Sequence, residues 1–144
     1  MTVLSDQPYG NANFRVEIDG IERSRFFEVQ LPDLGLEIAE YREGTDPIEP
    51  NPRLVARPRL GTLILRRGFR GEKELYEWWQ RNASGQTDQR NLSVILLNSE
   101  GTDVARWLMH RAIPVRLSYS PLDGLDGSPL LETLELTVES ISME

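Results

Sequence analysis

Short runs in which apolar and polar residues alternate recur along this chain of 144 residues, and they restrict it to a mainly β fold. Phe14, Val16 and Ile18 alternate with charged residues, and a second clean run covers 134–139. A period of two places alternate side chains on opposite faces of a strand. Further strands are predicted at 26–31, 36–43, 60–67, 91–97 and 104–113. The pattern predicts seven or eight strands around one helix in a single domain, 1–144.

Two turn signals shape the expected connections between these strands. The pair Asp19-Gly20 can adopt positive φ, so it predicts a hairpin that joins 14–18 to a return strand at 26–31. Pro114 is expected to end the strand at 104–113, because proline cannot donate a ladder hydrogen bond.

One segment, 72–82, has the period of a helix instead. Leu75, Trp78 and Trp79 are spaced i, i+3 and i+4, with acidic residues in the first turn and Arg81 in the last. We expect one tryptophan to pack against the sheet and the other to lie at its margin. A ligand platform formed by the two rings is the alternative interpretation.

Residues 44–59 interrupt the pattern with four prolines and few apolar side chains. Such a segment cannot form a helix or a central strand, so a long loop is predicted. Loops of this length are uncommon in compact domains and are usually functional or mobile. The N-terminal residues 1–12 are expected to be flexible.

The residue types present argue against most enzyme and nucleic-acid functions. The chain has no cysteine, so it has no thiol nucleophile, thiolate metal site or disulfide. Its one histidine, His110, lies inside a predicted strand beside Trp107 and Met109, which does not favour a catalytic triad. Sixteen bases against 23 acids give a net charge of −7, which opposes binding to phosphates or anionic membranes. We expect no enzymatic activity, cofactor or metal.

Two further expectations concern the surface and the membrane. The basic cluster Arg66, Arg67, Arg70 and Lys73 is balanced in part by neighbouring acids, so it is expected to be a solvated or subunit-pairing surface. The longest aliphatic run, 94–97, is far shorter than the roughly 20 residues that span a bilayer. No membrane span or secretion signal is predicted.

The order of these segments resembles the tail tube proteins of contractile phages and the inner tube proteins of phage-tail-like contractile injection systems. The resemblance covers nearly the whole chain. Its most telling stretches are 13–18, 40–44, 61–68, 75–79, 93–98 and 132–136.

The resemblance implies two packed antiparallel sheets, as a sandwich or barrel, with one flanking helix. It also implies a structural subunit that forms hexameric rings stacked into a hollow tube, driven through a target envelope. The partners it implies are other copies of the chain, a surrounding sheath, baseplate or spike proteins, and cargo or phage DNA in the lumen without sequence recognition. Such a protein is made in the bacterial cytoplasm and becomes part of an extracellular, cell-associated or virion particle.

Under this resemblance the segment 44–59 is an arm that docks on a neighbouring subunit or ring. The residues expected at that interface are Arg53, Leu54, Arg57, Pro58 and Arg59. Two alternatives stay open: a tube-initiating paralogue at the baseplate, and a small soluble β-sandwich module in which the tryptophans and the arginine-rich loop hold a ligand.

Overall fold

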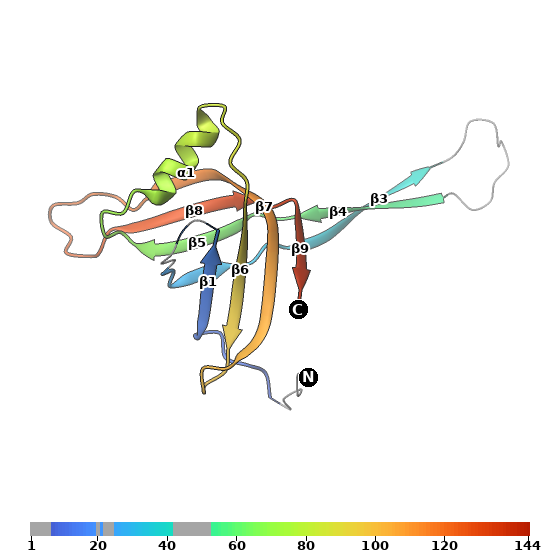
Figure 1. The fold of residues 1–144 in the computed structure, drawn as a ribbon, viewed down its shortest axis with the longest axis horizontal. Helices are drawn as coiled ribbons and strands as arrows, with labels where there is room; N and C mark the ends of the chain where they lie inside the picture. Colours follow the sequence, from blue (N-terminus) through green and yellow to red (C-terminus); the bar gives the residue numbers. More distant parts are fainter. Residues whose placement is uncertain (1–6, 20, 22–24, 42–52) are drawn as a thin grey trace.

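The computed structural model describes residues 7–19, 21, 25–41 and 53–144 of the chain (Figure 1). Within these parts lie nine strands and one helix. They are β1 (Phe14–Ile18), β2 (Glu28–Gln30), β3 (Leu34–Tyr41), β4 (Arg53–Leu60), β5 (Leu63–Gly68), α1 (Glu74–Ala83), β6 (Arg90–Leu97), β7 (Asp103–Tyr119), β8 (Leu131–Thr137) and β9 (Ser140–Met143). Residues 7–12 form no strand or helix, and the other residues expected to be flexible, 1–6, lie outside the described parts.

The strands form two antiparallel sheets, which confirms the predicted mainly β architecture with one helix. The larger sheet has seven strands in the order β1-β6-β7-β8-β5-β2, with β9 also paired to β7. The smaller sheet contains β3 and β4. In Figure 1, β1, β6 and β9 run across the direction of β5 and β8, and the curved β7 belongs to both layers. The larger sheet therefore folds over itself at β7, as in orthogonal β packing.

The strand β7 continues through Pro114, so the expectation that this proline ends the strand is wrong. Before the bend, β7 pairs with β6 and β9, and beyond it β7 pairs with β8. The pairing with β8 shifts register between Pro114 and Arg116, and Arg111 has a φ of 54°. An irregularity of this kind bends a strand and tolerates the missing N–H of proline. The bend lets one strand serve both layers.

The predicted hairpin between 14–18 and 26–31 is also wrong. β1 pairs with β6, where Val16 lies opposite Val94, and β2 pairs with β5, where Val29 lies opposite Leu65. Each strand thus joins a more buried partner, so more apolar surface is covered than in an isolated hairpin. Gly20 of the predicted turn lies outside the described residues.

The core lies between the two layers and under the helix. Leu63 and Leu65 of β5, Leu134 and Leu136 of β8 and Met109 of β7 are all fully buried. The helix α1 contacts β7 and adds to the same cluster. No helix of the described parts is long and apolar enough to cross a membrane.

Candidate subunit interface

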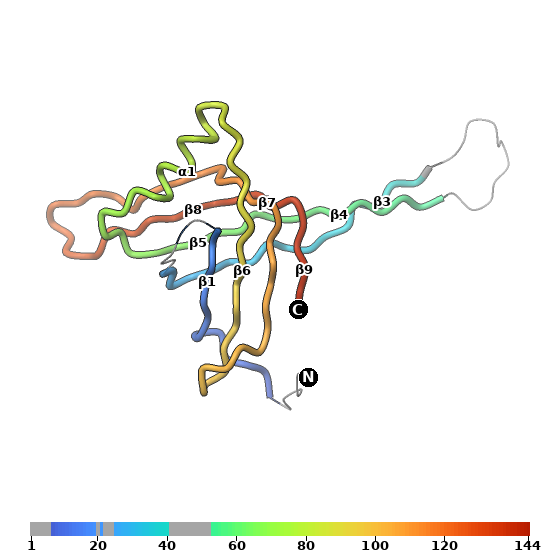
Figure 2. The backbone as a smooth tube through the Cα atoms, in the orientation of Figure 1, coloured from blue at the N-terminus to red at the C-terminus, as the bar shows by residue number. Residues whose placement is uncertain are grey.

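The strands β3 and β4 leave the body of the molecule as a two-stranded ribbon (Figure 2). We call residues 34–41 and 53–60 the arm. Their register pairs Leu34 with Leu60 at the base and Tyr41 with Arg53 at the far end. A ribbon of two strands is at best marginally stable alone in water, so an arm of this kind is suited to lie against another surface.

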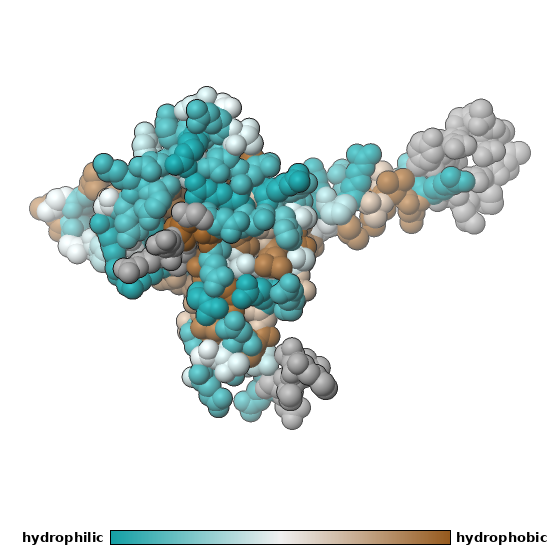
Figure 3. Space-filling model, in the orientation of Figure 1, coloured by the Kyte–Doolittle hydropathy of each residue, from teal (hydrophilic) through white to brown (hydrophobic). Residues whose placement is uncertain are grey.

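One face of the arm is apolar and exposed. Directly opposed residues of an antiparallel pair share a face, so Leu36 and Pro58 lie on the same side as Ile38 and Ala56. We call the set Leu34, Leu36, Ile38, Leu54, Ala56 and Pro58 the apolar face. The exposed fractions of Leu34, Leu36, Ile38 and Leu54 are 68%, 66%, 62% and 66%. Hydrophobic residues mark the arm in the space-filling view (Figure 3).

The opposite face of the arm is charged. Glu37 lies opposite Arg57, and its carboxylate is 3.3 Å from Nε of Arg59. Arg53 and Arg57 make no ion pair with another described residue, and both are exposed. The arm is therefore amphipathic, with an apolar face and an arginine-rich face back to back.

The expected loop 44–59 is corrected over Arg53–Arg59, which belong to β4, while 44–52 lie outside the described residues. Pro58 is compatible with this strand because both strands of a two-stranded ribbon are edge strands, where a missing donor can face solvent. The five expected interface residues divide between the two faces. Leu54 and Pro58 lie on the apolar face, and the three arginines lie on the charged face.

The residues expected for helix packing lie in two environments. Leu75 and Trp78 are fully buried, whereas Trp79 is partly exposed and faces the ring of Tyr76. The helix was predicted at 72–82 and is found at Glu74–Ala83. The indole Nε1 of Trp78 donates a hydrogen bond to the backbone oxygen of Asp88 at 2.8 Å. Burial and this hydrogen bond make Trp78 a core side chain rather than part of a ligand platform.

Asp88 holds the segment between α1 and β6 in place through hydrogen bonds. Its carboxylate accepts hydrogen bonds from Arg90 and Arg81, and these contacts, led by that with Arg90, hold the pKa of Asp88 below its ordinary value. The guanidinium of Arg90 also lies over the ring of Trp78, 4.9 Å from its centre. These contacts fix the entry into β6.

A buried ion pair was not anticipated from the sequence. Arg67, expected within a surface cluster, is only 3% exposed, and its Nε lies 2.6 Å from a carboxylate oxygen of the fully buried Glu132. The hydroxyl of Tyr119 donates to the other oxygen of Glu132 at 2.9 Å. Burial, followed by this hydrogen bond, raises the pKa of Tyr119 to about 12. The sequence held one signal of this burial. With a period of two, Arg67 lies on the same side of the strand as the apolar Leu63 and Leu65.

The described residues offer little to metal or acid–base chemistry. No group of three or more histidine or acidic side chains in these parts could hold a metal ion. His110 lies in β7 with its Nε2 3.2 Å from the hydroxyl of Ser142. Among the described residues, the exposed apolar face of the arm is the feature that a protein partner would best explain.

Comparison with solved structures finds the same fold in several other proteins. A chain of the anti-feeding prophage baseplate is 24% identical, with a TM-score of 0.75 and 97% of each chain covered. A chain of the sheath-tube complex of the extracellular contractile injection system PVC is 23% identical, with a TM-score of 0.75, over 96% of this chain and 93% of that chain. Hcp1 from Flavobacterium johnsoniae is 18% identical, with a TM-score of 0.57, over 91% and 94%.

These likenesses show that the fold is shared. No curated protein sequence matches the chain. The family model described as T4-like virus tail tube protein gp19 matches residues 10–142. The chain therefore belongs to the T4-like virus tail tube protein family and is a structural tube subunit.

Proposed function

We propose that the chain assembles into hexameric rings that stack into a hollow tube, and that the arm docks on a neighbouring copy. The observation that carries this proposal is the exposed apolar face of a ribbon that leaves the body (Figure 1). Large exposed apolar patches on a protein usually mark a site of interaction. A second copy is the partner favoured by membership of a tube family.

The energetics of the apolar face support a stable contact. Fully burying one leucine or isoleucine side chain stabilises by about 1.5–3 kcal/mol. Leu34, Leu36, Ile38 and Leu54 are each about two-thirds exposed, so covering all four would contribute roughly 4–8 kcal/mol per contact. Because a ring repeats this contact at every subunit, such a gain is large enough to drive assembly.

The charged face supplies specificity rather than most of the free energy. Arg53 and Arg57 are available for acidic groups of a neighbour, and exposed pairs of this kind contribute little each but suppress wrong registers. Fifteen of the sixteen basic residues of the chain are arginine, which favours multidentate pairing with carboxylates.

The proposed partners follow from the family and from the particles that contain similar folds. In this proposal the tube lies inside a contractile sheath, ends at baseplate or spike proteins, and carries cargo or DNA in its lumen without sequence recognition. The protein is synthesised in the bacterial cytoplasm and becomes part of an assembled extracellular, cell-associated or virion particle. No catalytic role is proposed.

Negative-stain microscopy of the purified chain, with mass measured in solution on the same samples, tests the proposal. Rings or tubes of uniform width, with a ring mass of six chains, are the expected result. A particle that stays monomeric at high concentration and binds neither sheath nor baseplate proteins would contradict it.

A further inference from the structure

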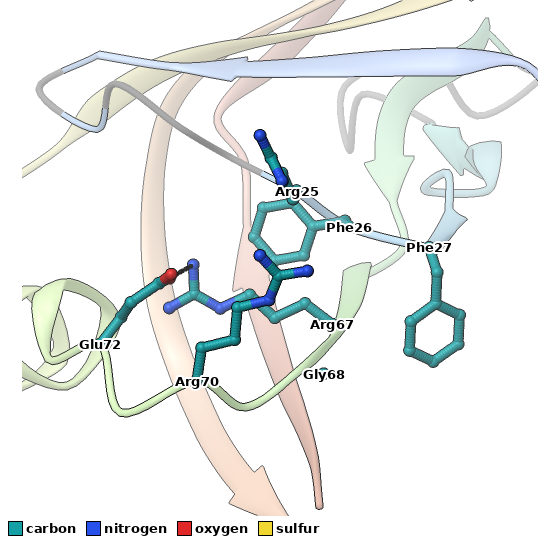
Figure 4. A pocket seen from close by; sticks show the side chains of 7 residues that line it. All are labelled: Arg25, Phe26, Phe27, Arg67, Gly68, Arg70 and Glu72. Atoms are coloured by element: carbon teal, nitrogen blue, oxygen red, sulfur yellow. Dashed lines mark ion pairs between the residues drawn. The ribbon is translucent and has the colours of Figure 1, made fainter. Parts of the chain in front are cut away.

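A pocket of about 360 Å³ lies at the C-terminal end of β5, beside the loop that leads into α1 (Figure 4). In Figure 1 this end of β5 is the end of the molecule opposite the arm. The pocket is lined by Arg25, Phe26, Phe27, Arg67, Gly68, Arg70 and Glu72. Figure 4 shows three arginines gathered around the ring of Phe26, with Glu72 beside Arg67 and the ring of Phe27 turned away from them.

The guanidinium of Arg67 is buried among three carboxylates of its own chain. Its Nε lies 2.6 Å from a carboxylate oxygen of Glu132. Nη1 is within ion-pair distance of Glu72, at 2.9 Å, and Nη2 is 3.9 Å from Glu74. Both Nη atoms are also buried, so a partner cannot reach them, and Arg25 and Arg70 are the accessible cations of the pocket.

The other two arginines of the pocket differ from Arg67. Arg25 and Arg70 are exposed, and neither makes an ion pair with a described residue. The three carboxylates that surround Arg67 make no ion pair with Arg25 or Arg70. Phe27 adds a ring that is 54% exposed. A partner that matches this pocket presents one carboxylate beside apolar groups.

The arm presents such a group. Glu40 lies opposite Leu54, on the side that carries Leu36 and Ile38. It is the one charged side chain among the described residues of that side, and it makes no ion pair with another described residue. An apolar strip that ends in one carboxylate complements a pocket that presents two exposed arginines beside the ring of Phe26.

We propose that the arm of one copy lies across the pocket of the next copy, with the carboxylate of Glu40 received by Arg25 and Arg70. This inference rests on the proposed assembly and names the receiving surface. Because the arm and the pocket are different surfaces at opposite ends, the contact is heterologous, and such contacts generate closed rings when the rotation closes. Carboxylates are recognised well by arginine because of the bidentate geometry of the guanidinium.

Charge reversal provides the first test, with Arg67 left intact because its burial ties it to the core. Glu40→Arg or Arg70→Glu alone should raise the critical concentration for assembly by about tenfold or more, since each leaves like charges facing one another. The double variant Glu40→Arg with Arg70→Glu should recover most of the loss. Glu37→Arg is the matched control, because Glu37 lies on the opposite face of the arm. It should change assembly much less.

Cross-linking provides a direct second test, because the chain has no cysteine. A variant with Glu40→Cys and Arg70→Cys, treated with a short bismaleimide, should give a ladder of covalent oligomers that ends at a closed ring. A control variant with Glu37→Cys and Arg70→Cys should give only monomers under the same treatment. The pocket contact would be overturned if the wild type forms tubes, the single charge reversals leave assembly unaffected and no ladder appears. That result would leave the tube proposal standing. Failure of the wild type to assemble would overturn both.

Discussion

Replacing Leu36 by serine should weaken assembly without destabilising the monomer. Leu36 is 66% exposed in the single chain and lies in the middle of the apolar face, opposite Pro58. Substitutions at exposed positions usually change the free energy of unfolding by less than about 0.5 kcal/mol. The melting temperature of the monomer should therefore stay nearly unchanged.

The cost to assembly follows from the exposed fraction. Burying a whole leucine side chain contributes about 1.5–3 kcal/mol, and two-thirds of that is roughly 1–2 kcal/mol per contact. A difference of 1.4 kcal/mol is a factor of ten in an equilibrium constant, so Leu36→Ser should weaken each contact about 5- to 30-fold. The critical concentration for tube formation should rise by at least this factor, because every subunit of a ring makes the contact.

The measurement is light scattering against protein concentration, with differential scanning calorimetry of the unassembled protein. Glu37→Ser is the control, because it changes the neighbouring residue on the charged face, where it removes an exposed pair with Arg59. A critical concentration that Leu36→Ser leaves unchanged, or that both variants shift equally, would refute the argument that the apolar face is buried between copies.

Three further results are expected. Trp78→Ala should lower the free energy of unfolding by about 3–5 kcal/mol in thermal or urea melts, whereas Trp79→Ala should cost much less, since Trp78 is fully buried and Trp79 is not; equal losses would contradict the assigned packing. One tyrosine should ionise near pH 12 in an absorbance titration, and Tyr119→Phe should remove this step. Because the folded pKa of Tyr119 is raised, its contribution to stability is complete below pH 10 and is lost as the pH rises towards 12. Raising salt from low to moderate concentration should lengthen tubes, because it screens repulsion between copies of net charge −7; steady dissolution with salt would show instead that exposed ion pairs hold the rings together.

The local alternation of the sequence was enough to predict much of the fold. The runs at 14–18 and 134–137, and the spacing of Leu75 and Trp78, identify strands and a helix because each side chain's face depends on nearby positions alone. The four prolines and few apolar side chains of 44–59 predicted a loop rather than a core element. This pattern did not reveal that Arg53–Leu60 pairs with β3, because the partner strand, rather than local propensity, makes this proline-containing segment extended.

The candidate site was predictable in part. The expected residues Arg53, Leu54, Arg57, Pro58 and Arg59 all lie on the arm, but their division between two faces required the register of β3 and β4. The apolar side chains contributed by β3 were assigned to a strand without being recognised as an exposed surface. Alternation predicts which residues share a face and says nothing of whether that face is covered.

The sequence by itself determined the mainly β class, an amphipathic helix that packs through Leu75 and one tryptophan, and a proline-containing segment whose described part, Arg53–Arg59, lies outside the core. Only the tertiary structure decided that β7 passes through Pro114, that β1 pairs with β6, and that Arg67 meets Glu132. The last two residues are 65 positions apart and become neighbours only through the register of β5 and β8. Such contacts depend on which distant strands pair. The alternation within one strand does not identify its partner, because the pairing is selected by the apolar surface that the whole fold buries.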